Sequence, residues 1–291
     1  MAILAFDMGG TAVKYGVWLD NQLTAQGNFP TPTTWEELKT TFFKVKNQLA
    51  ENYTITGVAV SAPGSVATEE GVIYGISAIP YIHFFPIQKE MEDLLGVPVT
   101  LENDANCAAL AEVWQGAAKG KQNVLFVVIG TGIGGAVIVD GKLRKGEHLY
   151  GGEFGIMILD NGRSFSDLGT AANMARRYSE DKGTLFTGKE VFELAEKGEV
   201  DALAAVHELY HYLSLGLYNL QFTLDPEMIV IGGGISEKSE LFTEINQRIE
   251  ARFVEKEIND FLPTIVPCKY KNDANLIGAV AVFKQIHPAL A

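Results

Sequence analysis

The sequence contains little cysteine and comparatively few basic side chains. Its two cysteines, Cys107 and Cys268, lie far apart in the chain, which excludes a disulfide framework and indicates a reduced, cytoplasmic protein. The 23 lysine and arginine residues stand against 36 acidic residues, which gives a formal charge of −13. A general nucleic-acid binder needs a basic face for phosphates, so this balance excludes nucleic acid as a partner. An anionic substrate would need local hydrogen-bond donors.

Long apolar segments are also absent. The longest, residues 124–139, is interrupted by glycines and is shorter than the roughly 20 residues of a membrane span. The opening residues MAILAFDMGG contain no basic segment and reach an acid at Asp7, so we expect neither a signal peptide nor a membrane partner. With 291 residues, 47% of them apolar, the chain is long enough for one large or two medium globular domains.

The second half of the sequence repeats the pattern of the first. A shift of 120 residues superimposes Asp20 on Asp140, and the segment VPVTLENDAN at 97–106 returns as VPCKYKNDAN at 266–275. We interpret this pattern as a duplicated β-β-β-α-β-α-β-α unit. It predicts two similar α/β domains with mixed sheets that flank a central cleft.

The boundary between the two domains is expected in the small, glycine-containing stretch QGAAKGKQ. The first domain would then cover residues 1–118 and be joined by the last helix, at about 277–291. The second domain would cover residues 119–276.

Glycine is plentiful, at 30 residues. In each half of the chain, one glycine-rich loop follows the first expected strand. In DMGGT, at 7–11, glycines let backbone amides approach an anion, and Asp7 could hold Mg²⁺ directly or through water. The alternative is a plain hairpin turn. GTGIGG, at 130–135, matches the dinucleotide fingerprint, but residues 136–143 read as a strand and not as the helix that this fingerprint requires. A phosphate-binding hairpin fits better.

A third loop, GGGI at 232–235, follows an expected strand and could admit a nucleoside close to the backbone. The alternative is an ordinary strand-to-helix connection. Each loop alone is weak evidence. Because the loops occupy matching places in the two halves, together they predict a bound nucleotide.

In their order along the chain, these motifs resemble those of the ROK sugar kinases, a family of the actin-like ATPase superfamily with ribonuclease H-like domains. DMGGTAVKYGV resembles the first phosphate motif of this family and GTGIGGAVIVDGKL its second. ENDANCAALAE resembles the catalytic segment, GGEFG the sugar loop and DPEMIVIGGGIS the adenosine segment. The repressor branch of the family carries a DNA-binding domain before its first strand. Here that strand begins at Ile3, so we expect an enzyme.

The resemblance implies that the first domain binds sugar and phosphate and the second the nucleotide, and it gives individual residues a role. Asp104 would be the general base that takes the proton of the sugar hydroxyl, and Gly64, Asn103, Asp104 and Glu153 would bind the sugar. ATP and its Mg²⁺ would be held by Asp7, Gly9, Gly10, Thr11, Lys14, Gly130, Thr131, Gly132, Gly134, Gly233, Gly234 and Ile235. The residues themselves leave one alternative open, in which Asn103 and Asp104 only cap a helix. For the repeated pair at 272–273 we expect no more than that.

The sequence departs from the family after the sugar loop. Typical members continue with a histidine and a cysteine-rich segment that binds structural zinc, whereas here Ile156 follows the loop and LDNGRSFSDLGT contains neither cysteine nor histidine. We therefore expect no zinc. Bacterial β-glucoside kinases share this pattern, so the expected reaction is ATP-dependent phosphorylation of glucose or a β-glucoside at the 6-hydroxyl. An N-acylhexosamine (N-acetylmannosamine-type) kinase, a non-catalytic sugar sensor and a homodimer remain open.

One further motif indicates a different class of enzyme. HELYH, at 207–211, matches the H-E-x-x-H pattern of zinc proteases. It lies in an apolar helical pattern that supplies no third ligand, so we expect an ordinary helix. His83, His148 and His287 are expected to be surface or loop residues, and Cys107 a small buried side chain.

Overall fold

The computed structural model describes residues 1–290, which form two units. Unit 1 consists of Met1–Lys119, Gly146–Tyr150 and the chain from Asn272 onward. Unit 2 consists of Gly120–Lys145 and Gly151–Lys271. The last described residues therefore belong to the same unit as the first.

Unit 1 is built on a five-stranded sheet that mixes antiparallel and parallel pairs. The strands of this unit are β1 (Ala2–Met8), β2 (Ala12–Leu19), β3 (Gln22–Pro30), β4 (Ile55–Ala62), β5 (Ser65–Ala67), β6 (Val72–Tyr74) and β7 (Val99–Asn103). β5 and β6 form a separate hairpin. The order of strands in the large sheet is β3-β2-β1-β4-β7. β1 is central, with antiparallel neighbours on one side and parallel β4 and β7 on the other.

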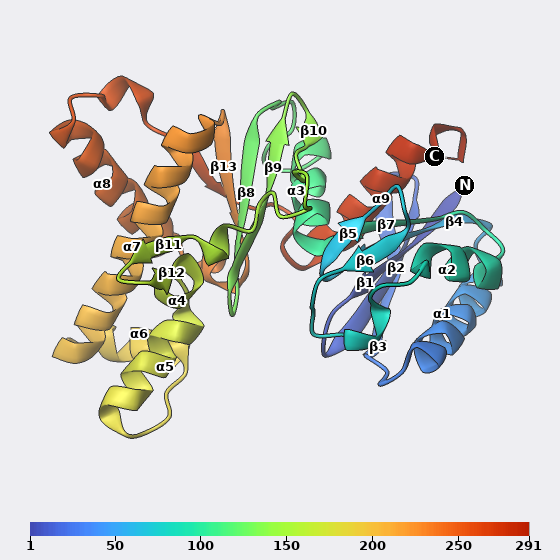
Figure 1. Ribbon diagram of the computed structural model, residues 1–291, viewed down its shortest axis with the longest axis horizontal. Helices are drawn as coiled ribbons and strands as arrows, with labels where there is room; N and C mark the ends of the chain where they lie inside the picture. The colour runs from blue at the N-terminus through green and yellow to red at the C-terminus, as the bar shows by residue number, and fades with distance from the viewer. Residues whose placement is uncertain (291) are drawn as a thin grey trace. The chain divides into compact units, whose positions relative to one another are not determined.

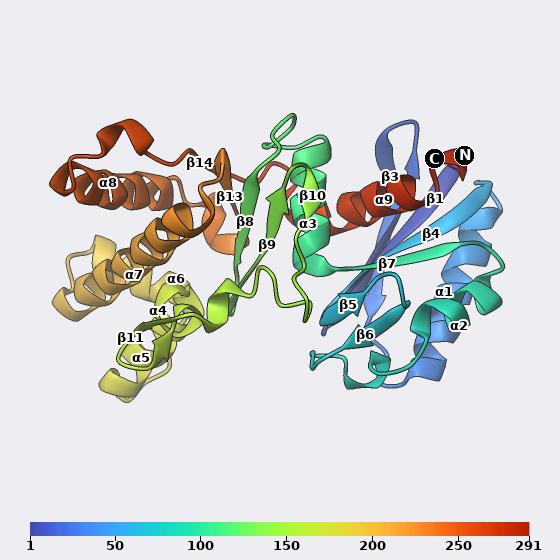
Figure 2. The same cartoon turned by 45° about the horizontal axis from the view of Figure 1, so that its top comes forward.

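Helices cover both faces of this sheet (Figures 1 and 2). The helices of unit 1 are α1 (Trp35–Ala50), α2 (Ile87–Leu95), α3 (Asp104–Trp114) and α9 (Ala274–Ile286), with short 3₁₀ turns at η1 (Pro80–Ile82), η5 (Lys271–Asp273, at the unit boundary) and η6 (Pro288–Leu290). Because side chains alternate along a strand, Leu4 and Phe6 share a core with α1 and α2. On the opposite face α9 lies so close that a Cβ at Gly57 would come within 1.9 Å of the Phe283 ring.

Unit 2 contains a second five-stranded mixed sheet, in the order β10-β9-β8-β13-β14. The strands of this unit are β8 (Val124–Ile129), β9 (Ile133–Val139), β10 (Lys142–Leu143), β11 (Ile158–Asp160), β12 (Arg163–Ser164), β13 (Met228–Gly232) and β14 (Ile265–Pro267). β11 and β12 form a separate small hairpin. β8 again has an antiparallel neighbour, β9, on one side and a parallel neighbour, β13, on the other.

The helices of unit 2 gather on one side of its sheet (Figure 1). They are α4 (Phe165–Gly169), α5 (Ala171–Lys182), α6 (Gly188–Glu196), α7 (Val200–Leu224) and α8 (Ser239–Glu255), with 3₁₀ turns at η2 (Phe154–Ile156), η3 (Gly234–Glu237) and η4 (Asn259–Phe261). Leu125, Val127 and Ile129 of β8 share one buried core with Phe165 and with the apolar face of α7.

The predicted duplication is confirmed by the strand order. In each sheet the first strand is central, the second and third follow on one side, and the two later strands follow on the other. The turns between the second and third strands also match, since Asp20 and Asp140 both have positive φ, at 49° and 53°. The fold is α/β with two mixed sheets, as predicted. None of the helices in the described part of the chain combines the length and the apolar character that crossing a bilayer requires.

Candidate nucleotide and sugar site

The first glycine loop, between β1 and β2, leaves two backbone donors available. Gly9 donates its N–H to the carbonyl of Ala12 at 3.1 Å and closes the turn. No atom of residues 1–290 accepts from the amides of Gly10 and Thr11, and both residues are exposed. Gly10 cannot be replaced by a larger residue, because its Cβ would lie 2.6 Å from that of Ala78. Two adjacent free amides at an exposed turn form a ready binding place for an anion.

Asp7 lies at the end of β1, directly before this loop. Its carboxyl is buried, and Oδ1 accepts from Ser61 Oγ at 2.9 Å and from Asn275 Nδ2 at 3.0 Å. No described residue donates to the other oxygen, Oδ2. Lys14 is paired with Asp7 across the β1–β2 ladder and forms no ion pair within the described chain. A buried carboxylate with one unused oxygen is a suitable donor for a hydrated Mg²⁺, because this cation prefers oxygen ligands and keeps part of its water.

The second glycine loop repeats this arrangement between β8 and β9. Gly130 donates to the carbonyl of Gly132 at 2.9 Å, while the amides of Thr131 and Gly132 donate to no described residue. A Cβ at Gly130 would meet nothing within 4 Å. The polypeptide itself therefore imposes no steric need for glycine at this position. The chain continues from Gly132 into strand β9, so this loop is not a dinucleotide-binding turn, as the sequence predicted.

The third glycine loop joins β13 to the short turn η3. Gly233 has a φ of 90°, and a Cβ there would lie 2.1 Å from the carbonyl oxygen of Ile129, so glycine is required by the fold. Gly234 is different, since open space surrounds its Cβ position. Ile235 follows within η3. The space at Gly234 would allow a flat ligand to approach the backbone.

The segment at 103–104 lies where β7 passes into α3. Asn103 is the N-cap of the helix, where its Oδ1 accepts from the amide of Asn106 at 3.1 Å. Its Nδ2 donates to the carbonyl of Gly64 at 3.0 Å. Asp104 is the first residue of the helix, and its Oδ1 accepts from the amide of Ala105 at 2.8 Å. Capping is thus performed by Asn103, and the Asp104 carboxylate is held at the positive end of α3.

Glu153 lies in unit 2, in the loop directly before η2. Its side chain is exposed, but the loop removes part of the water around the carboxyl, and this desolvation raises the pKa of Glu153 above its ordinary value. The loop needs its glycines. A Cβ at Gly152 would lie 2.4 Å from the carbonyl oxygen of Gly135, and a Cβ at Gly155 would lie 2.0 Å from that of Ile133. The glutamate loop and the second glycine loop are therefore packed together.

The repeated pair in the second half differs from the first. Asp273 occupies the N-cap position of α9, but its side chain makes no capping hydrogen bond. Instead Asn275, which corresponds to Asn106, donates to Asp7. The repeat is visible in the sequence, but this contact was not predicted from it, although the shared N-D-A-N could have indicated it.

Other residues beside the predicted site were also missed. Glu102 is buried at the end of β7, where it accepts from Asn106 Nδ2 at 2.9 Å and from the amide of Asn103 at 2.8 Å. His83 lies beside Gly64, with its Nε2 2.8 Å from Ser77 Oγ and its buried Nδ1 without a partner in the described chain. Glu102 opens the ENDAN segment quoted above, and its position there was the available signal, whereas His83 belongs to no motif and only the fold brings it here.

The H-E-x-x-H motif is not a protease centre. It lies within α7, where Glu208 accepts from Arg163 and from Arg177, each at 3.2 Å. With both of its oxygens occupied by guanidinium groups, Glu208 is not placed to act on a metal-bound water. No group of three or more His, Cys, Asp or Glu side chains among residues 1–290 could hold a metal ion. Cys107 is fully buried, and this burial raises the pKa of its thiol.

A duplicated mixed-sheet fold, with a glycine hairpin after the first strand of each half, defines the class of the protein as that of the actin-like ATPases. The chain belongs to the ROK family, whose model matches residues 3–286. The family predicted from the motifs is therefore confirmed.

Individual relatives match the chain over almost its full length. A β-glucoside kinase of Klebsiella pneumoniae is 37% identical over 99% of this chain and 97% of its own. The structure of a ROK family protein from Streptococcus pneumoniae in complex with sucrose has a TM-score of 0.90 at 34% identity, covering 99% of this chain and 100% of that one. A Listeria monocytogenes protein provisionally named an N-acetylmannosamine kinase has a TM-score of 0.87 at 34% identity, with coverage of 99% and 100%. The prediction of a sugar kinase is confirmed.

Proposed function

We propose that this kinase transfers the γ-phosphoryl group of ATP to the 6-hydroxyl of glucose or of a β-glucoside. One observation carries the phosphoryl-transfer part: both glycine hairpins leave two consecutive exposed amides without a partner, at Gly10–Thr11 and at Thr131–Gly132. Phosphoryl transfer depends on positioning and on donors for phosphate oxygens, and backbone amides provide these without net positive charge. This suits a chain whose formal charge is −13.

The metal in this proposal is Mg²⁺, held through Asp7. The buried Asp7 carboxylate keeps Oδ2 unused while Ser61 and Asn275 fix Oδ1, which is the donor arrangement that a hydrated cation needs. When bound, Mg²⁺ would neutralise charge on the nucleotide phosphates. Lys14, opposite Asp7, would add a positive charge beside the same phosphates.

Asp104 is the proposed general base. Asn103 supplies the helix cap, and Asp104 follows as the first residue of α3, where its carboxylate would take the proton of the sugar hydroxyl. Asn103, fixed on the carbonyl of Gly64, would hydrogen-bond the sugar together with Asp104, and Glu153 would accept from its hydroxyls. The third glycine loop, with open space at Gly234, would hold the nucleoside.

Glucose or a β-glucoside is proposed as the substrate because the β-glucoside kinase relative matches the whole chain. Ile156 stands where the family's sugar-contacting histidine is expected, so the hexose preference is open to variation. The Listeria neighbour supports an N-acylhexosamine as the second candidate.

A coupled ADP-release assay over glucose, β-glucosides, N-acetylmannosamine and N-acetylglucosamine tests the proposal. We expect sugar-dependent ADP release, largest with glucose or a β-glucoside, and a product phosphorylated at the 6-position by NMR. If ADP release is highest with an N-acylhexosamine, that sugar is the substrate in place of glucose or a β-glucoside. Tight sugar binding by calorimetry without any turnover would identify a sensing protein.

A further inference from the structure

Helix α4 carries a serine that reaches the second glycine hairpin. Ser166 Oγ accepts a hydrogen bond from the backbone N–H of Ile133, at 2.9 Å. The same oxygen lies 3.5 Å from the Cβ position of Gly132 and 2.3 Å from that of Gly155. Ser166 is therefore at the place where the second glycine loop and the glutamate loop of unit 2 meet.

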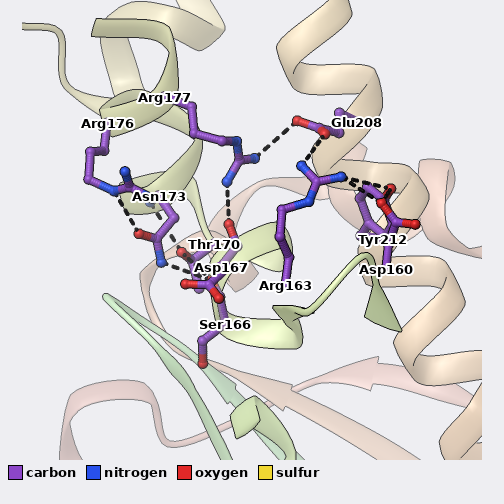
Figure 3. Close-up of polar contacts among 10 residues, drawn as sticks. All are labelled: Asp160, Arg163, Ser166, Asp167, Thr170, Asn173, Arg176, Arg177, Glu208 and Tyr212. Atoms are coloured by element: carbon purple, nitrogen blue, oxygen red, sulfur yellow. Dashed lines mark hydrogen bonds and ion pairs between the residues drawn. The ribbon is translucent and has the colours of Figure 1, made fainter. Parts of the chain in front are cut away.

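The backbone of α4 is fixed from the opposite side (Figure 3). The carbonyl of Ser166 accepts from Thr170 Oγ1 at 3.1 Å and from Asn173 Nδ2 at 2.9 Å. The carbonyl of Asp167 accepts from the Arg177 guanidinium. These bonds fix the helix to the start of α5 and leave the Ser166 hydroxyl pointing toward the hairpin.

A network of ion pairs extends this support to α7 (Figure 3). Glu208 accepts from Arg163 and Arg177, and Arg163 also donates to Asp160 Oδ2 at 2.7 Å. Tyr212 Oη donates to the same Asp160 oxygen at 3.0 Å. The β11–β12 hairpin and α4, which form the segment where the resemblance places zinc ligands in typical family members, are thus connected to α5 and α7.

The bond from Ile133 decides which amides of the hairpin stay available. Ile133 donates to Ser166 and Gly130 to Gly132, which leaves Thr131 and Gly132 as the two free donors. A turn of three residues with two glycines has many accessible conformations, so without an anchor a ligand would have to order it on binding. The hydrogen bond from the Ile133 amide to Ser166 Oγ provides this anchor in the absence of the ligand.

We propose that Ser166 is a positioning residue that holds the second glycine hairpin in the conformation that binds the nucleotide phosphates. This rests on the proposed function, in which that hairpin binds ATP. Ser166 acts through the Ile133 amide, and the network of Figure 3 keeps α4 in place behind it.

The test compares Ser166→Ala with Ser164→Ala in the full-length protein. Ser164 caps the same helix by accepting from the amide of Asp167 at 3.2 Å, but it does not contact the hairpin. For Ser166→Ala we expect the KM for ATP to rise about three- to tenfold, because a rise of this size corresponds to the loss of one hydrogen bond. The kcat, the KM for sugar and the melting temperature should change little, and the Ile133 amide should exchange faster with deuterium. Ser164→Ala should lower the melting temperature and leave the KM for ATP unchanged.

An unchanged KM for ATP in Ser166→Ala, or a rise equal to that in Ser164→Ala, would overturn the proposal. If Ser166→Ala proves unstable, Asn173→Ala replaces it, since it removes one bond to the Ser166 carbonyl and should give a smaller rise in the KM for ATP. Failure of the proposed function itself would be distinguishable, because the wild-type protein would then show no sugar-dependent ADP release.

Discussion

At Asn103 and Asp104, two adjacent polar side chains have different environments because a strand passes into a helix between them. Asn103 accepts the capping bond and is tied to Gly64, while Asp104 starts the helix with its carboxylate near the positive end of the helix dipole. The same letters at 272–273 meet a 3₁₀ turn, where Asp273 makes no capping bond. Identical sequence therefore has unequal consequences in the two halves.

Replacing Asp104 by asparagine tests this inequality. Asp104→Asn keeps the size and hydrogen-bonding ability of the side chain but removes the proton acceptor, so kcat should fall by about 10²–10⁴-fold. Nucleotide affinity should stay nearly unchanged. The matched control, Asp273→Asn, should retain close to full turnover. Steady-state kinetics on both variants decide the matter: near-normal turnover in Asp104→Asn, or greater damage in Asp273→Asn, would show that the base is another residue.

Glu153 should make sugar binding sensitive to acid. Desolvation raises its pKa, so the carboxylate is protonated at a higher pH than an ordinary glutamate and loses its strength as an acceptor. We expect the KM for sugar to rise as the pH falls through this raised pKa, while the KM for ATP stays constant. Sugar kinetics at saturating ATP, and ATP kinetics at saturating sugar, between about pH 5 and 8 would show it.

The same residue should have the opposite effect on stability. The folded state disfavours the Glu153 carboxylate, so its charge costs free energy at pH values above its raised pKa. This cost disappears as the pH falls below the ordinary glutamate value. Glu153→Gln should therefore melt at a slightly higher temperature than the wild type at neutral pH and at the same temperature in acid, although its KM for sugar is raised at neutral pH. A lower melting temperature at neutral pH would contradict this assignment.

At the scale of elements, the glycine hairpins combine two kinds of glycine. Some are required by the fold, such as Gly135, where a Cβ would lie 2.3 Å from the carbonyl oxygen of Phe126. Others, such as Gly130, have open space around their Cβ position, and the proposed nucleotide would account for glycine there. The sequence alone does not distinguish these two kinds of glycine.

Alanine substitutions separate the two kinds. Gly130→Ala should leave the melting temperature unchanged or slightly raised, because φ is not positive there and nothing lies within 4 Å of the new methyl group. Crowding the ligand by one methyl costs about 1–3 kcal/mol, so the KM for ATP should rise roughly tenfold. Gly135→Ala should instead destabilise the protein clearly. Measuring melting and ATP kinetics on both variants tests the assignment, which fails if Gly130→Ala binds ATP normally.

At the scale of the whole molecule, the segment that follows the sugar loop is held to α5 and α7. Arg163 of β12 donates to Glu208 of α7, and the Ser166 carbonyl of α4 accepts from Asn173 of α5. Arg177 of α5 donates to the same Glu208. We predict that the purified protein contains no stoichiometric zinc and keeps its melting temperature in the presence of EDTA. Its activity should nevertheless disappear with EDTA and return with Mg²⁺, because the nucleotide phosphates need the cation. Elemental analysis that finds about one zinc per chain would refute the first part.

The sequence by itself determined the family, the α/β class and the duplication, because these depend on local patterns. Strand alternation, glycine turns and helix caps involve residues a few positions apart, and the repeat exposed the second half by its similarity to the first. It also indicated Asp7, Asp104 and the three glycine loops, since their chemistry requires particular residue types next to one another. The exclusion of a dinucleotide fingerprint at 130–135 followed from the strand pattern alone.

Only the tertiary structure decided how these residues are supported. Asn275 reaches Asp7 across 268 positions of sequence, and Ser166 reaches Ile133 across 33, with no motif that links either pair. The fold also decided that Glu208 of the H-E-x-x-H motif is held by two arginines from other elements. Such contacts depend on the packing of helices against sheets, and packing brings together side chains whose sequence positions are independent of one another.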